Sequence, residues 1–432
     1  MVIDLKYARS RTTFLAAVLF ISTALSFFSG RAFLASHWNE SANPELWRRA
    51  ARLEPGNAEY WGHVGLIGQW DVDPKGTAEA IDNLEAATRI NPHSPELWLE
   101  LADAYQSSGD PIKAQDAYRE AQSSHPASAE VAWRFGSFLL YEGKATAAHE
   151  EIRRALLLNP SLAPDAISEC WHSDPNVDSL IDDVLPARFI HFHDAMNFFL
   201  SQHLTDPALA VWNRQQSLGL PLHMADAVPL VDALIDANRT IEAAQVWKQS
   251  LRSSGSSEAS PDDQSLVFNG GFEHDIVNGG YDWREETASG VSFDIDNLTA
   301  HSGSRSLRVR FDGTVNLDFH HLFQYIPVEP DSRYQFSAYL RTEAISTDRG
   351  ICVEISDPRH SSRLQLQTPE LFGSNPWTRV QEDFVTGHDT HFIKLALRRL
   401  PSWKFDNKLA GTVWIDDVGL TYLRPASRNG AT

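Results

Sequence analysis

Cysteine and positive charge are both scarce in this chain of 432 residues. Its two cysteines, Cys170 and Cys352, fall in different halves, so neither a disulfide framework nor a cysteine-rich zinc site is available. Lys and Arg number 37 against 57 Asp and Glu, which gives a formal net charge of −20. Nucleic acid and anionic lipid both require a basic binding surface. The composition therefore argues against either as the main partner, and we expect no nucleic acid to bind.

Recognisable catalytic motifs are also lacking. The sequence has no G-x-S-x-G, no Walker sequence and no H-E-x-x-H. The pairs of histidines or acids that could bind a metal or cleave a sugar stand only one or two residues apart. The histidines of each such pair lie on different faces of a helix or strand, and adjacent acids are usually solvated. These pairs are His191 with His193, His320 with His321, Glu285 with Glu286, and Asp182 with Asp183. We therefore expect a protein that is not an enzyme.

Long hydrophobic runs are rare, and the clear one lies near the N-terminus. Residues 12–30 carry no charge, and Lys6, Arg9 and Arg11 precede them. Such a run has about the length needed to cross a bilayer. The positive flank should stay in the cytoplasm, which places the bulk of the chain outside it, in the periplasm or at the cell surface.

Residues 1–36 fit either a cleaved signal peptide or an uncleaved signal anchor. Cleavage needs small residues after the apolar run, but the large Phe27, Phe28 and Phe33 stand there. The sequence therefore favours the anchor, with the membrane contacted through residues 12–30.

A regular spacing of prolines organises the next part of the chain. Pro92, Pro126 and Pro160 follow one another at intervals of 34 residues, and Pro55 precedes them at a slightly longer interval. A period of this size is typical of stacked helical hairpins, because one hairpin cannot bury its own apolar face. We therefore predict an all-α array over residues 37–251, with two less regular hairpins near residues 186–217 and 222–251.

One unit of this array carries the pattern of a known family. Its residues in order are Trp98, Leu101, Ala102, Tyr105, Gly109, Ala114, Tyr118, Ala121 and Pro126. This order and spacing resemble the tetratricopeptide repeat. The resemblance implies a solenoid of helical hairpins whose surface binds a protein partner.

The character of the sequence changes after residue 251. Residues 252–264 are small and polar, as in a flexible linker. Short alternating segments follow, and they predict an all-β sandwich over residues 265–424, with a tail at 425–432. The predicted strands cover residues 306–311, 334–341, 351–355, 379–385, 392–397 and 412–420. The predicted fold is therefore a membrane segment, an all-α solenoid and a C-terminal all-β domain.

Two motifs mark the ends of this β domain. Residues 269–273 read N-G-G-F-E, and residues 415–418 read I-D-D-V. With the segment 281–283 between them, they resemble the carbohydrate-binding modules of the family four, nine and twenty-two group. The resemblance implies a galactose-binding-like jelly roll that binds a glycan or polysaccharide.

The same resemblance implies a structural Ca²⁺ where the opening and closing strands meet. Carboxylates suit this hard cation, and the resemblance assigns Glu273 with Asp416 or Asp417. Strand alternation predicts that Asp416 and Asp417 point to opposite faces, so that only one reaches the ion. The alternative is that these acids only satisfy amides of a nearby loop.

Glycan binding should use aromatic rings with a few polar side chains. Trp283, Trp377 and Trp414 lie in the motifs of the family and are assigned to packing. Trp403 and Phe405 occupy an irregular polar segment, where packing explains less, and are the preferred candidates. The other candidates are Phe319, His321, Tyr325, Tyr339, Arg341, Gln324 and Glu354.

The order of segments predicts an exported adaptor anchored in the membrane. The array would bind a protein and the sandwich a glycan, in polysaccharide assembly, export or surface attachment. Two alternatives remain open. The sandwich has lost sugar binding and serves only as a protein contact, or the chain is an accessory subunit that targets a glycoside hydrolase.

Overall fold

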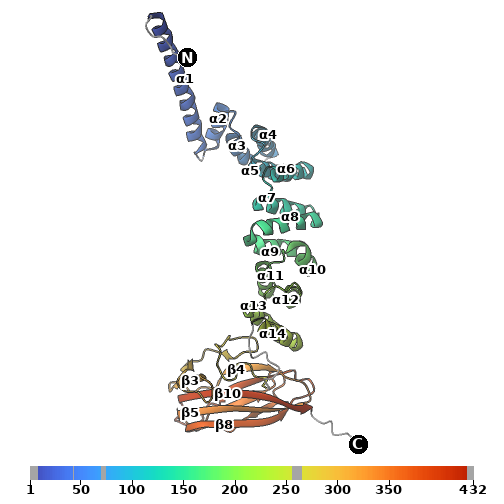
Figure 1. Cartoon of the computed structure of the whole chain (residues 1–432), viewed down its shortest axis with the longest axis vertical. Coiled ribbons are helices and arrows are strands. Elements are labelled where there is room, and N and C mark those ends of the chain that lie inside the picture. Colours follow the sequence, from blue (N-terminus) through green and yellow to red (C-terminus); the bar gives the residue numbers. More distant parts are fainter. Residues whose placement is uncertain (1–7, 42, 70–73, 255–264, 426–432) are drawn as a thin grey trace. The chain divides into compact units, whose positions relative to one another are not determined.

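The computed structural model describes residues 8–41, 43–69, 74–254 and 265–425. Two compact units make up the chain, Met1–Pro186 and Ala187–Thr432. The first is helical, and the second joins two helical hairpins to a β-sandwich (Figure 1). The predicted fold class, α followed by β with an apolar N-terminal segment, is confirmed.

The helices of the first unit follow one another with short connections. They are α1 (Ala8–Asn39), α2 (Pro44–Leu53), α3 (Ala58–Gln69), α4 (Pro74–Ile90), α5 (Pro95–Ser107), α6 (Pro111–Ser124), α7 (Ala129–Tyr141), α8 (Ala145–Leu158), η1 (Pro160–Leu162), α9 (Ala163–Ser173), α10 (Val177–Ser179) and η2 (Leu180–Val184).

Helix α1 contains the apolar segment. Its part from Arg11 to Asn39 is long and apolar enough to cross a membrane, as a membrane anchor or a signal sequence would be. The last turns of the helix pack against the array, where Ala35 is fully buried beside Ala50 and Tyr60. Arg31 forms an ion pair with Glu54 at 2.6 Å. The apolar helix therefore continues without a break into the first packing cluster of the array.

Helical hairpins α3–α4, α5–α6 and α7–α8 pack as the repeat predicted. A Cβ added to Gly65 would lie 2.5 Å from Leu84, and one added to Gly136 would lie 2.6 Å from Ile152. The small residues of the repeat therefore let paired helices approach closely. Helices α6 and α8 end two residues before Pro126 and Pro160, since proline cannot continue them.

Residues 180–184 form a helical turn although they include the acidic pair Asp182 and Asp183. This is the π-helical turn η2, and its side chains Leu180, Ile181 and Val184 are buried. Arg153 donates hydrogen bonds to the carbonyls of Asp182 and Leu185, at 3.1 and 2.9 Å. The apolar residues on either side of the acidic pair therefore bury the turn.

The second unit begins with the two hairpins that were predicted near residues 186–217 and 222–251. Their helices are α11 (Phe189–Ser201), α12 (Thr205–Ser217), α13 (Met224–Asp236) and α14 (Thr240–Ser254). The predicted linker at 252–264 and tail at 425–432 lie almost wholly outside the described residues.

Two antiparallel sheets form the sandwich. One has the strand order β1-β4-β9-β6-β7 and the other β2-β3-β10-β5-β8. The core between them contains Phe336, Leu397 and Val413. The strands are β1 (Arg284–Glu285), β2 (Val291–Asp296), β3 (Ser306–Asp312), β4 (Phe319–Pro327), β5 (Ser332–Ile345), β6 (Cys352–Ser356), β7 (Gln365–Gln367), β8 (Gly373–Val385), β9 (Phe392–Arg399) and β10 (Ala410–Pro425).

The six predicted strands are present, but β1, β2, β4 and β7 were not predicted. Strand β4 contains the polar residues His320, His321 and Gln324 at positions that interrupt the alternation expected of a strand. A register irregularity between Phe319 and Leu322 accompanies this break. Strands β1 and β7 are too short to give a periodic signal.

The hairpin α13–α14 packs directly on the sandwich. The indole of Trp247 contacts the rings of Phe268 and Tyr281 edge to face, at centroid distances of 5.3 and 6.2 Å. Asp232 accepts a hydrogen bond of 2.8 Å from the amide of Gly280 and pairs with Arg284. These contacts hold the last hairpin and the sandwich together in one compact unit.

Gly280 should be essential to this joint. It has a φ of +58°, and a Cβ there would lie 2.5 Å from the ring of Trp247. We expect Gly280→Ala to lower the free energy of unfolding by about 2–4 kcal/mol, from left-handed strain and overpacking together. Urea unfolding of the full chain in detergent measures this change.

Gly373→Ala is the matched control, because Gly373 has a φ of +66° but open space where its Cβ would lie. This substitution should lower the free energy of unfolding by about 1 kcal/mol, from the left-handed backbone strain alone. Equal losses in the two variants would contradict the close contact with Trp247.

Candidate functional site

The outer face of the sheet β1-β4-β9-β6-β7 gathers polar and aromatic side chains. Side chains alternate along a strand, and the register places Phe323 opposite Ala396 and Ala396 opposite Glu354. The same row continues through Glu354 to Gln367. We call this surface the β4–β9 face; it carries Arg284, His321, Phe323, Tyr325, Lys394, Arg398, Glu354, Gln365 and Gln367.

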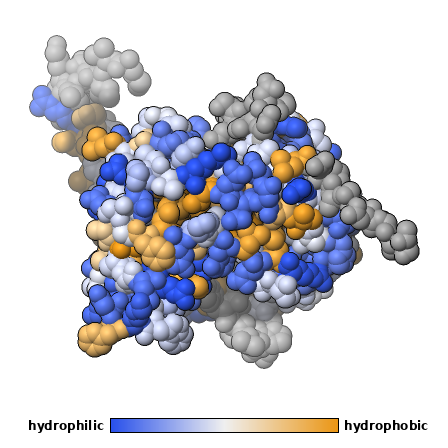
Figure 2. Space-filling model, turned by 90° about the horizontal axis from the view of Figure 1, so that it is seen from below, coloured by the Kyte–Doolittle hydropathy of each residue, from blue (hydrophilic) through white to orange (hydrophobic). Residues whose placement is uncertain are grey.

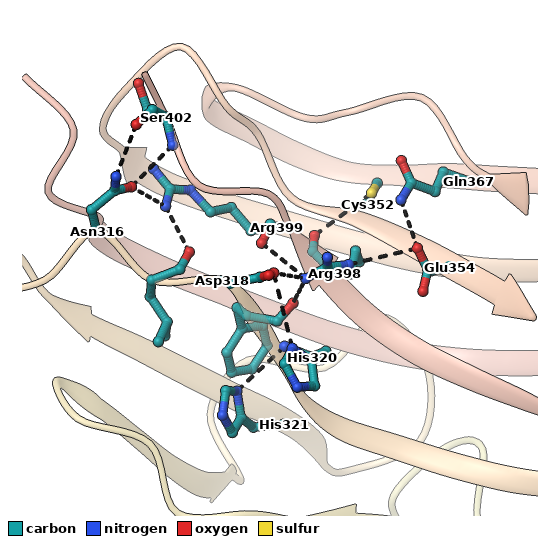
Figure 3. A network of polar contacts seen from close by, with 12 residues as sticks. Asn316, Asp318, His320, His321, Cys352, Glu354, Gln367, Arg398, Arg399 and Ser402 are labelled. Atoms are coloured by element: carbon teal, nitrogen blue, oxygen red, sulfur yellow. Dashed lines mark hydrogen bonds and ion pairs between the residues drawn. The ribbon is translucent and has the colours of Figure 1, made fainter. Parts of the chain in front are cut away.

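A polar network crosses this face (Figure 3). The Glu354 carboxylate accepts hydrogen bonds from the amides of Gln367 at 2.7 Å and Gln365 at 3.3 Å. Its Oε2 also lies 3.6 Å from the Arg398 guanidinium. Arg398 in turn pairs with Asp318 and donates to the carbonyl of Phe319 at 3.0 Å. The network fixes donors and acceptors side by side, with the Arg398 and Glu354 side chains 13% and 14% exposed.

His320 and His321 stand at the end of this network. Their rings stack, with centroids 4.6 Å apart. Burial lowers the pKa of His321, and the neighbouring His320 lowers it further. The His321 ring is therefore neutral near pH 7, and it can both donate and accept a hydrogen bond.

Two aromatic rings lie beside the polar network, each with a cation above it. The Lys394 ammonium lies 3.8 Å from the centroid of the Phe323 ring, and the Arg284 guanidinium lies 5.3 Å from that of Tyr325. Burial lowers the pKa of Lys394 and raises that of Tyr325. Cation–π contacts of this kind hold the rings in fixed orientations.

A cleft of about 410 Å³ opens beside these rings. Its walls come from β1, from β4 and from the C-terminal end of helix α13. Clefts of this size hold small ligands or one end of a larger one. The lining includes Asp236, Arg284, Glu285, Glu286, Phe323 and Tyr325.

The loop between β9 and β10 presents the two preferred aromatic candidates. Trp403 is 93% exposed and Phe405 is 103% exposed. Below them the buried Arg399 donates to the Asn316 side chain at 2.9 Å and to the Leu317 carbonyl at 2.7 Å (Figure 3). The base of the loop is therefore held rigidly while both rings face solvent.

The structure does not bring the nine predicted sugar-binding residues together. His321, Tyr325 and Glu354 share the β4–β9 face, as described above. Tyr339 and Arg341 belong to β5 in the other sheet. Their side chains have other neighbours, since His301 stacks on Tyr339 at 3.5 Å and the Arg341 guanidinium lies 5.1 Å from the centroid of a Trp414 ring.

Phe319 and Gln324 are corrections to the sequence prediction. Both are fully buried, and Phe319 packs in the core against Phe311. The Gln324 amide donates a 2.8 Å hydrogen bond to the carbonyl of Phe268. Gln324 alternates with Phe323 and Tyr325, so it points between the sheets, and neither residue presents a surface to a glycan.

Sequence reasoning missed Gln367, Arg398 and Lys394. Strand β9 was predicted, and its alternation would have put Lys394 and Arg398 on one face. Gln367 lies on a strand of three residues and gave no signal. The contribution of helix α13 could not be found from local sequence, because it depends on how the hairpin packs.

The acids that were predicted to bind Ca²⁺ both accept hydrogen bonds from the segment 301–305. A Cβ added to Gly271 would lie 3.9 Å from Glu273 Cγ and 4.0 Å from Asp416 Oδ1. Glu273 accepts hydrogen bonds from the amides of Ser304 and Arg305, at 2.8 and 3.0 Å. The Ser304 hydroxyl and amide are the main reasons that the pKa of Glu273 is lowered. The opening and closing ends of the sandwich therefore lie side by side.

Asp416 and Asp417 do not point apart, and the alternation argument was wrong here. Asp416 accepts from the amide of His301 at 2.7 Å, and Asp417 accepts from the Ser302 hydroxyl at 2.6 Å. The pairing register shifts after Asp416, and Asp417 has a φ of +47°. This bulge turns both carboxylates toward the same loop. Burial raises the pKa of Asp416.

Ca²⁺ itself remains a prediction. Across the described part of the chain, no group of three or more His, Cys, Asp and Glu side chains could hold a metal ion. An ion between Glu273 and Asp416 would therefore need backbone carbonyls as further ligands, which suits calcium chemistry.

We expect chelation to lower the melting temperature of the full chain by about 5–10 °C, if free Ca²⁺ had been near 100 times its dissociation constant. Differential scanning fluorimetry with Ca²⁺ and then EDTA measures this shift. Glu273→Gln should melt at one temperature in both buffers. If EDTA leaves the wild-type melting temperature unchanged, the acids only accept hydrogen bonds from the amides of the loop.

On the face shown in Figure 2, hydrophobic areas are bordered by hydrophilic ones. Exposed apolar side chains of the sandwich include Phe372 and Val385, each 49% exposed. Scattered apolar residues are normal on soluble domains, so they do not by themselves mark a second site.

Comparisons with known proteins agree with both resemblances. Residues 76–135 match a family described as tetratricopeptide repeat, and residues 264–397 match one described as carbohydrate binding domain. Neither type of domain is catalytic. A comparison with curated proteins finds no match.

Three solved structures, each similar to part of this chain, are the following. PilF of Pseudomonas aeruginosa is 18% identical, over 45% of this chain and 76% of its own, with a TM-score of 0.24. The CBM22-1 and GH10 modules of Clostridium thermocellum xylanase 10B, complexed with xylohexaose, are 14% identical, over 37% of this chain and 28% of theirs, with a TM-score of 0.27. A CBM4 module is 15% identical, over 36% of this chain and 99% of its own, also with a TM-score of 0.27.

Proposed function

We propose that this chain is a non-catalytic adaptor, in which the helical array binds a protein and the β4–β9 face of the sandwich binds a glycan. The match to a carbohydrate binding domain supports glycan binding, and the match to tetratricopeptide repeats supports a protein partner. The observation that carries the proposal is the row Gln367–Glu354–Arg398, which lies beside two aromatic rings on one sheet face.

This arrangement suits the chemistry of sugars. A pyranose presents hydroxyl groups at its rim and C–H groups on its faces. Glu354 accepts hydrogen bonds from hydroxyls, Arg398 donates to them, and Gln367 can do both. The Tyr325 ring offers an apolar surface for a sugar face. Ring and polar groups on one sheet can therefore bind the face and the rim of the same glycan.

Substitutions on the β4–β9 face should lower the affinity for the glycan. We expect Gln367→Ala to weaken binding about fivefold to tenfold, because one hydrogen bond is removed. Tyr325→Ala should weaken it at least as much. The measurement is binding of the full chain in detergent to a broad glycan panel, followed by titration calorimetry with the best ligand.

Trp403→Ala is the control, because Trp403 lies in the exposed β9–β10 loop. It should leave the affinity unchanged. If Trp403→Ala abolishes binding while Gln367→Ala does not, the loop is the site. If the folded protein binds no glycan, the sandwich is a protein contact, as in the alternative raised by the sequence.

We propose further that residues 1–36 stay on the protein as a membrane anchor, with the bulk of the chain outside the cytoplasm. The end of helix α1 is part of the packing of the array, through Ala35 and the Arg31–Glu54 pair. Removal of the segment would expose Ala50 and Tyr60, which Ala35 covers.

Roles in polysaccharide assembly, export or surface attachment are consistent with an anchored glycan-binding adaptor, as is the targeting of a separate glycoside hydrolase.

Intact mass spectrometry of the protein from membranes should show that residues 1–36 are retained. The control variant is Phe33→Ala, which completes an A-x-A sequence ending at Ala35 and so gives a better cleavage site. We expect a shorter, released product to increase in this variant. A wild-type protein that already begins after residue 30 and leaves the membrane on carbonate washing would contradict the anchor.

A further inference from the structure

The end of helix α13 lies against the sandwich at two places. Arg359, in the connection after β6, donates hydrogen bonds to the carbonyls of Ile235 and Asp236, at 2.8 and 3.2 Å. These carbonyls belong to the last turn of the helix, where a cation is favoured. On the other side, Asp232 pairs with Arg284 of β1. The sandwich therefore fixes the position of this helix end.

The cleft beside Tyr325 is a consequence of this arrangement. Its lining combines Asp232, Ile235 and Asp236 of α13 with β1 and β4. Asp236 is the exposed last residue of the helix, so its carboxylate is free to interact with a ligand. One wall of the cleft thus belongs to the helical hairpin and not to the β domain.

Negative charge predominates in this cleft. Asp232, Asp236 and Glu286 line it with one cation, Arg284, which is paired with Asp232. Glu285 also borders the cleft, but it pairs with Leu322 in the sheet and so points to the opposite side of β1 from Arg284. Lys394 lies near Glu286 but is held above the Phe323 ring. Within the described residues, no ion pair within 4.0 Å is found for Asp236, Glu285 or Glu286.

We propose that hairpin α13–α14 is part of the glycan site, and that its Asp236 wall selects uncharged glycans over glycans that carry carboxylates. This proposal rests on the proposed function and specifies its ligand class. Carboxylates of the cleft accept hydrogen bonds from sugar hydroxyls, and such charge-assisted bonds are stronger than neutral ones. The same carboxylates repel a uronate, and because Asp236 and Glu286 are exposed this repulsion is screened by salt.

Two matched ligands test the selection. Each neutral oligosaccharide that binds the full chain is compared with its counterpart oxidised to the uronate at C6. We expect the wild type to bind the neutral form at least tenfold more tightly. Asp236→Asn should weaken binding of the neutral form about fivefold and reduce the ratio of the affinities for the neutral and oxidised forms. Added salt should reduce the same affinity ratio in the wild type.

Glu150→Gln is the control, since it removes an exposed carboxylate from α8, outside this unit. It should change neither affinity. The proposal is overturned if Gln367→Ala weakens binding but Asp236→Asn alters neither affinity nor selectivity, in which case glycan binding by the β4–β9 face still stands. It is also overturned, together with the proposed function, if the folded wild type binds none of the glycans.

Discussion

Close contact between Gly280 and Trp247 is the constraint on which the second unit depends. With no side chain at Gly280, the indole can lie against the backbone and Asp232 can reach the Gly280 amide. Arg284 then lies between Asp232 and the Tyr325 ring. The same contact that joins hairpin to sandwich thus places a charged group over the ring proposed to bind sugar. Stability and recognition share these residues.

Strand alternation decides which face of the sheet each side chain of β4 occupies. Phe323 and Tyr325 lie on the outer face, while Gln324 between them points into the core. A shift of one residue would exchange these roles, and the buried amide of Gln324, which donates to the Phe268 carbonyl, helps to oppose it. A polar residue inside the sandwich therefore contributes to the arrangement of the outer face.

Periodic features of the sequence were sufficient to predict much of the fold. The proline spacing and the small residues of the repeat predicted the hairpins, and Gly136 against Ile152 shows why. Local irregularity defeated the same reasoning. The bulge at Asp417 turned a side chain that alternation had placed on the opposite face. The wall from α13 depends on packing between distant segments, which a single sequence does not reveal.

Helix α1 has a mechanical consequence. It runs for 32 residues, about 48 Å at the usual rise of an α-helix, and its last turns are clamped by Ala35 and Arg31. A helix without a hinge transmits tension and torque along its axis. A load applied to the array by a bound partner would therefore reach the apolar segment directly. The Arg31–Glu54 ion pair joins α1 to the array, so it would bear part of this load.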